Sequence, residues 1–283
     1  YPVVEIKTLQ QLQDTEEWKS MSKIAKAFEN KKAFIPFVTA GDPTLDVTEQ
    51  LLYEMQKAGA DLIEIGIPFS DPTAEGPVIQ EANERALAEG CTTDKIFDML
   101  KRAKEKITVP MVFLTYVNPI FTYGKERFMK QCVESGIDGL IVPDMPYEER
   151  EELAPACEKY GVDIIPLIAP TSHERIKMIA KKAQGYIYCV SSLGVTGVRN
   201  EIKTDIGAMV KAVRETTDVP CAVGFGIATP EQAYKMAKVS DGAIVGSAIV
   251  KIIAKYGKDS VPYVGEYVKS MKEAVEKADK ESK

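Results

Sequence analysis

The sequence contains a single histidine, His173, and five cysteines, of which no two have a CxxC spacing. A Ser-His-Asp or Cys-His triad would have to be built on that one histidine, and a His-rich metal site is excluded. The scattered cysteines fit unpaired thiols in a reducing, cytoplasmic compartment rather than a disulfide framework or a zinc site. Acid–base chemistry therefore falls to Asp, Glu, Tyr or Lys, and we expect no metal and no cofactor in this chain.

Long apolar runs and an excess of positive charge are also missing. No run approaches the roughly 20 apolar residues that a membrane-spanning helix needs. The formal net charge is −6 and the pI is about 5.2, which argues against a nucleic-acid partner or an anionic membrane surface. Hydrophobic residues make up 45% of the 283 residues, so the chain has enough apolar material for a folded core.

Residues 1–20 differ in composition from the rest and hold the only tryptophan, Trp18. Met21 opens MSKIAKAF, which is typical of a natural start and of an amphipathic helix. We therefore expect an appended segment over residues 1–20 and a single domain over residues 21–283. The alternative is that residues 1–20 form a docking arm.

Short apolar runs alternate with helical periods along the chain. These runs do not alternate between apolar and polar residues, which is typical of parallel strands covered on both faces. Eight such strands, each followed by at least one helix, predict a single-domain (βα)8 barrel with an extra N-terminal helix. The alternative is a doubly wound open sheet. The predicted strands are 34–39, 62–67, 111–116, 139–143, 164–168, 186–190, 221–225 and 242–246, and the predicted helices include 45–58, 78–88, 94–105, 125–135, 147–160, 172–183, 203–216 and 230–238.

Glu64 is a carboxylate inside the otherwise apolar second strand, LIEIGI. A buried Glu is rare without a purpose, so this residue is either a structural partner of a neighbouring group or a general acid/base with a raised pKa. In a (βα)8 barrel, function lies at the carboxyl ends of the strands. The loop that follows, residues 68–77, carries Asp71 and Glu75, which could supply a second proton-handling group or could be ordinary turn residues.

Three glycine-rich loops follow the last strands, at residues 191–200, 224–231 and 246–250. Free backbone N–H groups beside a helix N-terminus bind phosphate, and the loops after strands 7 and 8 are the usual place for it in a barrel. The GFG at 224–226 lacks the third glycine of a dinucleotide fingerprint. Aromatic residues at four strand ends either wall a flat ligand or fill the core: Phe37, Tyr116, Tyr188 and Phe225.

Seven motifs along the chain, in the same order, match those of a known family. The chain resembles the tryptophan synthase alpha chain from about Met21 to Tyr256, and the string PFSDPTAEGPVIQ after the second strand is its most specific part. The other matching motifs, in order, are FIPFVTAGDP, TYVNPIFTYG, GLIVPDMP, GVTG, VGFGI and VGSAIV.

The resemblance implies a TIM barrel that cleaves indole-3-glycerol phosphate to indole and glyceraldehyde 3-phosphate, a retro-aldol reaction. It implies that Glu64 moves a proton to indole C3 and that Glu75 accepts the indole N–H hydrogen bond. Position 75 departs from the commonest pattern, in which Asp stands; Glu keeps the charge and adds one methylene.

Other roles carry over position by position. The resemblance implies that Phe37, Tyr116, Tyr188, Thr196 and Phe225 surround the substrate. It places the phosphate at Gly197, Gly226, Gly246 and Ser247.

The resemblance also implies a partner, a PLP-dependent beta chain in an alpha2beta2 tetramer that receives indole through a tunnel. It links Asp144 to communication with that partner and makes the loop 194–202 a lid. Ser192 stands where some members carry Arg, and we assign it no role.

Three rival functions stay open on the sequence alone. The first is a stand-alone indole-3-glycerol phosphate lyase without a beta chain. The second is another phosphate-binding barrel, such as an epimerase or a prenyl-phosphate transferase. The third is a weakly active alpha chain that only regulates its partner, which the unusual Glu75 makes conceivable.

Overall fold

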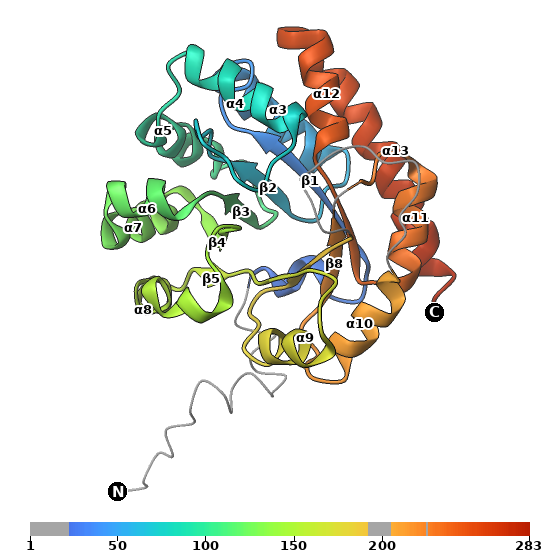
Figure 1. The fold of residues 1–283 in the computed structure, drawn as a ribbon. Coiled ribbons are helices and arrows are strands. Elements are labelled where there is room, and N and C mark those ends of the chain that lie inside the picture. Colours follow the sequence, from blue (N-terminus) through green and yellow to red (C-terminus); the bar gives the residue numbers. More distant parts are fainter. Residues whose placement is uncertain (1–22, 192–204, 225) are drawn as a thin grey trace, which may run out of the picture.

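The computed structural model describes residues 23–191, 205–224 and 226–283, which form one parallel β-sheet with helices around it (Figure 1). The strand order is β5-β4-β3-β2-β1-β9-β8-β7-β6, so each predicted strand pairs with its expected neighbour. The strands are buried along almost their whole length, as a parallel sheet covered on both faces requires. They are β1 (Ala33–Thr39), β2 (Ile63–Gly66), β3 (Met111–Leu114), β4 (Ile137–Ile141), β5 (Asp163–Ile164), β6 (Leu167–Ile168), β7 (Ile187–Val190), β8 (Cys221–Gly224) and β9 (Gly242–Val245).

The predicted fifth strand, 164–168, is split into β5 and β6 at Pro166, which has no backbone N–H to donate. β5 pairs with β4, and β6 pairs with β7. The two edges of the sheet are therefore joined by a short piece of continuous chain. This seam closes the sheet, and the predicted (βα)8 barrel is confirmed with one strand in two pieces.

The helices lie outside the sheet in Figure 1. Several begin at a capping side chain: Thr44 accepts from the Val47 N–H, and Thr229 forms a capping box with Gln232. The predicted helix 147–160 is divided because Pro155 fits only the first turn of a new helix. The α-helices are α3 (Leu45–Lys57), α4 (Pro77–Ala88), α5 (Thr93–Ala103), α6 (Val117–Tyr123), α7 (Lys125–Ser135), α8 (Ala154–Tyr160), α9 (His173–Ala180), α10 (Ile206–Arg214), α11 (Pro230–Val239), α12 (Ser247–Tyr256) and α13 (Ser260–Lys280), and the 3-10 helices are η1 (Ala25–Phe28), η2 (Tyr147–Glu152) and η3 (Gly257–Asp259).

Where an N-terminal helix was expected from Met21, the described residues contain only the 3-10 turn η1. The side chain of Ile24, directly before this turn, is fully buried. Its Cδ1 leaves no room for a Cβ at Gly139. Ile24 and Phe28 belong to the cluster that fills the barrel interior, so this short segment closes the amino end of the barrel. Residues 1–20 lie outside the described residues.

Alternate residues of the strands face either the barrel interior or the surrounding helices. One set, which includes Ile35, Leu62 and Ile244, fills the barrel interior. The other set, which includes Phe34 and Ile63, packs against the surrounding helices. The interior packing leaves the carboxyl ends of the strands, where the expected functional residues lie, as the open end of the barrel.

The long helix α13 packs against α11, α12 and α3. It buries an apolar stripe that includes Val264, Val268, Met271 and Val275. Its Lys272 reaches the start of β2, where Nζ lies 2.7 Å from Oδ2 of Asp61. Of the helices in the described ranges, none is both long and apolar enough to cross a membrane.

Candidate active site

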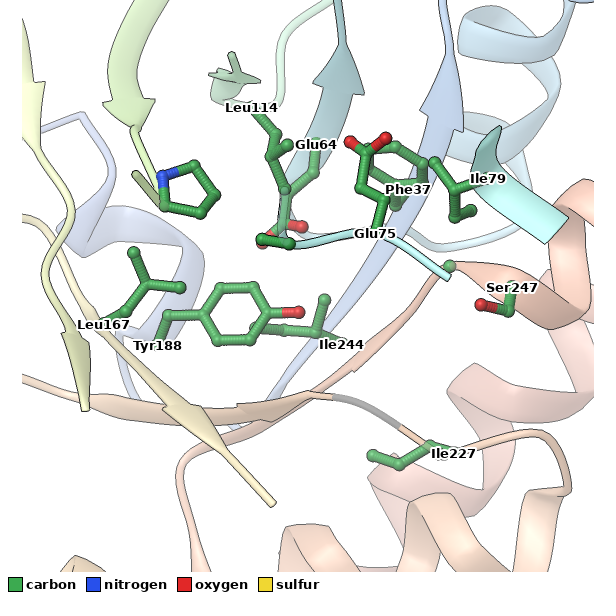
Figure 2. Close-up of a pocket in the computed structure, with 14 residues that line it drawn as sticks. Phe37, Glu64, Glu75, Ile79, Leu114, Leu167, Tyr188, Ile227, Ile244 and Ser247 are labelled. Carbon is green, nitrogen blue, oxygen red and sulfur yellow. The ribbon is translucent and has the colours of Figure 1, made fainter. Parts of the chain in front are cut away.

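A cavity that is open to solvent at its mouth lies at the carboxyl ends of the strands. Its wall is mostly apolar, and two carboxylic acids, Glu64 and Glu75, stand in it. Figure 2 shows the carboxyl group of Glu75 beside Phe37 and Ile79, directed away from that of Glu64, with Ser247 at another side of the cavity. The lining residues are Phe37, Glu64, Ala74, Glu75, Ile79, Leu114, Pro143, Leu167, Tyr188, Gly226, Ile227, Ile244, Gly246 and Ser247.

Glu64 is placed by β2, where it is in register with Phe37 on β1 and Val112 on β3. Its side chain is only 1% exposed. Burial raises the pKa of Glu64 to about 8, and a hydrogen bond from a tyrosine lowers it in part. At neutral pH this carboxyl group therefore holds its proton and can donate it.

Tyr186 is the hydrogen-bond donor: its hydroxyl lies 2.5 Å from Oε1 of Glu64. The side chain is fully buried, and its ring contacts Phe28 at the closed end of the barrel with 5.7 Å between centroids. Tyr188 was expected at the site from the sequence, and Tyr186 was not. The signal was available, because residues two apart on a strand share a face and the motif YIYCV puts both tyrosines on the inner one.

Glu75 comes from the loop between β2 and α4 and is 5% exposed. Asn83 of α4 donates from Nδ2 to Oε2 of Glu75 across 2.7 Å. Burial raises the pKa of Glu75 to about 7, while hydrogen bonds from Asn83 and Tyr116 lower it. Near neutral pH this group is therefore partly ionised and can accept a hydrogen bond.

Asp71, in the same loop, was expected to be either a second proton-handling group or a turn residue. Asp71 is exposed and accepts a hydrogen bond from the neighbouring Ser70, so it acts as a turn residue. Tyr116 lies behind the loop, where its hydroxyl accepts from the Ala74 N–H at 3.3 Å. Of the two acidic residues, Glu75 alone lines the cavity.

Apolar and aromatic side chains form most of the wall. In Figure 2 the ring of Tyr188 lies between Leu167 and Ile244. Its hydroxyl lies against Gly224 of β8, where there is no room for a Cβ. Phe37 and Leu114 line the same cavity from β1 and β3. Such a wall suits a flat aromatic ligand.

One end of the cavity is suited to an anion. Ser247 is the first residue of α12, and Gly246 is its N-cap, so unpaired backbone N–H groups gather there. Gly226 has φ +79°, a left-handed conformation that favours glycine. A Cβ at Gly246 would lie 3.2 Å from Cδ1 of Phe37, so a larger residue would crowd the wall. Phosphate is the anion that such helix ends commonly bind.

The structure therefore brings together Glu64, Glu75, Phe37 and Tyr188 with the anion-binding end at Gly226, Gly246 and Ser247. Three of the expected residues, Thr196, Gly197 and Phe225, lie outside the described residues, as do Ser192 and the loop 194–202. In the described part of the chain, no three His, Cys, Asp or Glu side chains gather as a metal site would require. Asp144 is exposed and caps α6 by accepting from the Val117 N–H at 3.0 Å.

The family model described as "Tryptophan synthase alpha chain" matches residues 24–279. A tryptophan synthase alpha chain from Lacticaseibacillus casei is 49% identical over 256 residues, which cover 90% of this chain and 96% of that protein.

Solved structures show the same likeness. The tryptophan synthase subunit alpha of Legionella pneumophila superposes with a TM-score of 0.83 at 38% identity and covers 91% of this chain and 99% of that one. A chain from the tryptophan synthase a2b2 complex of Pyrococcus furiosus superposes with a TM-score of 0.79 at 34% identity, over 85% of this chain and 98% of that one.

Proposed function

The chain belongs to the tryptophan synthase alpha chain family, and from this premise we propose that Glu64 and Glu75 carry the proton transfers of its reaction. The enzyme is a lyase that cleaves indole-3-glycerol phosphate to indole and glyceraldehyde 3-phosphate. The observation that carries the assignment is the pair of buried carboxyl groups in one cavity, whose environments raise their pKa values to about 8 and about 7. Two carboxyl groups tuned differently take different roles.

The first step is proton transfer to carbon. Glu64, protonated at neutral pH, gives its proton to C3 of the indole ring, which turns the ring into a protonated indolenine (3H-indolium) that keeps its N–H proton. Glu75, as a carboxylate, accepts the hydrogen bond of the ring N–H and stabilises the positive charge that develops on nitrogen. This second role requires the ionised form of Glu75.

The second step breaks the bond between C3 and the adjacent carbinol carbon. The carbinol O–H loses its proton to the Glu64 carboxylate and the carbon becomes the aldehyde of glyceraldehyde 3-phosphate. The bonding electron pair returns to the ring, which leaves as indole. Glu64 ends the cycle protonated, so the reaction consumes no external acid or base.

The remaining site residues bind the substrate in this proposal. Phe37, Tyr188, Thr196 and Phe225 surround the ring and the glycerol chain, and Tyr116 acts from behind the loop through its hydrogen bond to Glu75. The phosphate binds at the N-terminus of α12. The free N–H groups and the helix dipole there favour an anion, which supports this part of the proposal. The phosphate-binding residues are Gly197, Gly226, Gly246 and Ser247.

We further propose that the chain works within an alpha2beta2 complex, in which PLP belongs to the beta chain. The match to a chain of the Pyrococcus furiosus a2b2 complex supports this. The catalytic domain is assigned to residues 21–283, and residues 1–20 to an appended segment. A cytoplasmic location, expected from five unpaired cysteines, stays a prediction.

The test is indole release from indole-3-glycerol phosphate by the purified chain, with and without a beta chain. We expect activity that the beta chain stimulates and that Glu64→Gln and Glu75→Gln abolish. Full activity without stimulation would instead support a stand-alone lyase. Complex formation without indole release in either setting would support a purely regulatory chain and overturn the proposed roles of both carboxyl groups.

A further inference from the structure

Asn83 is a polar residue on the buried side of α4. Its neighbours on that side are Ile79, Ala82 and Ala86, and the side chain is 3% exposed. A buried amide costs free energy unless its donors are satisfied. Asn83 meets this need by donating to Oε2 of Glu75 at 2.7 Å, eight residues earlier in the chain.

The helix that carries Asn83 is itself fixed to the barrel. Arg85 makes a two-pronged ion pair with Asp42, which follows β1, with Nε–Oδ1 and Nη2–Oδ2 distances of 2.8 and 2.9 Å. Gln80 donates from Nε2 to the backbone carbonyl of Glu75 at 2.7 Å. The amide of Asn83 is therefore a donor held in a fixed place relative to β1.

A glutamate needs such a fixed donor more than an aspartate would. The longer side chain of Glu75 has one more rotatable bond, so its carboxylate can occupy more positions unless contacts restrict it. Asn83 and Tyr116 both hydrogen-bond to this carboxylate. Two donors from different elements remove most of the rotational freedom that the extra methylene adds.

We propose that Asn83 is a positioning residue for Glu75: its amide holds Oε2, so that Oε1 stays directed at the ring nitrogen of the substrate. The inference rests on the proposed role of Glu75 as the acceptor of the indole N–H. Asn83 itself acts through Glu75, and the amide also favours the ionised carboxylate that this role needs.

The experiment measures kcat and KM for indole release by the full chain with a beta chain, from pH 6 to pH 9.5, in wild type and in Asn83→Ser. Serine is too short to reach Oε2. We expect kcat at pH 7 to fall about 10- to 100-fold, because a small misplacement of a catalytic group costs this much. We expect KM to change little, because the phosphate end of the cavity is untouched. The rising limb of the pH profile should move to higher pH, and activity should partly recover there.

Two further variants distinguish positioning of the Glu75 carboxylate from general support of the loop between β2 and α4. Asn83→Asp keeps the size of the side chain but sets a second carboxyl group against Glu75, so the rising limb should move further up than in Asn83→Ser. Gln80→Ala is the matched control, because it removes a bond to the same residue at its backbone rather than its carboxylate. The rising limb of its pH profile should stay at the pH of the wild-type limb.

An unchanged rising limb in both Asn83 variants, with Glu75→Gln inactive, would overturn the positioning role and leave the proposed function intact. Equal limb shifts in Gln80→Ala and Asn83→Ser would also overturn it, since general loosening of the loop would then explain both. Full activity of Glu75→Gln would instead remove the proposed function of Glu75.

Discussion

Asp61, two residues before β2, and Glu64, the second residue of β2, each carry a buried carboxyl group, and the surroundings of the two groups are opposite. At the amino end, Asp61 receives two cations, Lys31 and Lys272, each with Nζ–Oδ distances of 2.7 Å, and the backbone N–H of Phe34 at 2.8 Å. Three residues on, Glu64 receives the hydroxyl of Tyr186 and, within the described part of the chain, no cation.

The difference assigns Asp61 to the stability of the fold and Glu64 to the chemistry of the site. A buried carboxylate with cations on both oxygens is compensated and ties α13 and the chain before β1 to the barrel. A buried carboxyl group without a cation keeps its proton, which costs stability at higher pH but supplies an acid at neutral pH. Asp61 is therefore held by paired charges, whereas Glu64 is a neutral acid at pH 7 with no cation beside it in the described part of the chain.

The largest effect should come from removing the acid at the open end. In Glu64→Gln we expect kcat to fall at least about 10³-fold, since the proton donor and acceptor of both steps is lost. The thermal midpoint at pH 7 should stay near that of wild type, because the glutamine amide and the protonated carboxyl group of Glu64 are both neutral. The paired measurement is indole release and thermal unfolding. A large drop in the midpoint would show that Glu64 supports the fold instead.

The opposite pattern is expected at the closed end. Asp61→Ala leaves Lys272 buried without its partner, so we expect a loss of about 3 kcal/mol in the free energy of unfolding. The activity of the folded fraction at 25 °C should stay near that of wild type. Urea unfolding measures the free energy of unfolding, and the indole assay measures the activity. The control is Lys31→Met, which removes the more exposed cation and should cost about 1 kcal/mol or less.

The comparison also predicts how pH acts on the open end. Glu75 must be ionised and Glu64 protonated, so kcat/KM should rise through about pH 7 and fall through about pH 8. The free energy of unfolding should fall as pH rises from 5 to 9, because both folded carboxyl groups hold protons that the unfolded chain releases near pH 4.5. Urea unfolding of wild type beside Glu64→Gln tests this. An equally steep fall in the variant would assign the slope to other groups.

The smallest effect should follow Tyr186→Phe, which keeps the ring and its contact with Phe28. The hydroxyl lowers the pKa of Glu64, so its loss raises that pKa and moves the falling limb of the pH profile to higher pH. We expect a stability loss of about 1 kcal/mol for one hydrogen bond. A falling limb that moved to lower pH would contradict the assignment of that limb to Glu64.

Much of the barrel could be predicted from the sequence because apolar runs and helical periods alternate so regularly. The seam could have been placed as well, since Pro166 lies inside a predicted strand. The closure of the amino end by Ile24 could not, because a single apolar residue beside a one-turn helix has no periodic pattern.

The site was predictable where a residue broke its local pattern. Glu64 stood out as a charge in an apolar strand, and Glu75 as an acid in a fixed loop. Asn83 broke the apolar face of its helix in the same way and was overlooked. Its partner could not be inferred, because the contact joins a helix to the loop before it through a side-chain geometry that spacing alone does not determine.

The pairing of β1 with β9 has a consequence for synthesis on the ribosome. Lys32 donates from Nζ to the Ser240 carbonyl, a contact that spans 208 residues, and Ala33 begins the register between the two strands. At about 5–20 residues per second, β1 waits roughly 10–40 s after its own synthesis for this partner. Over that time the nascent chain carries an apolar strand with one unpaired edge, which is where a chaperone would bind or where a second nascent chain could pair with it.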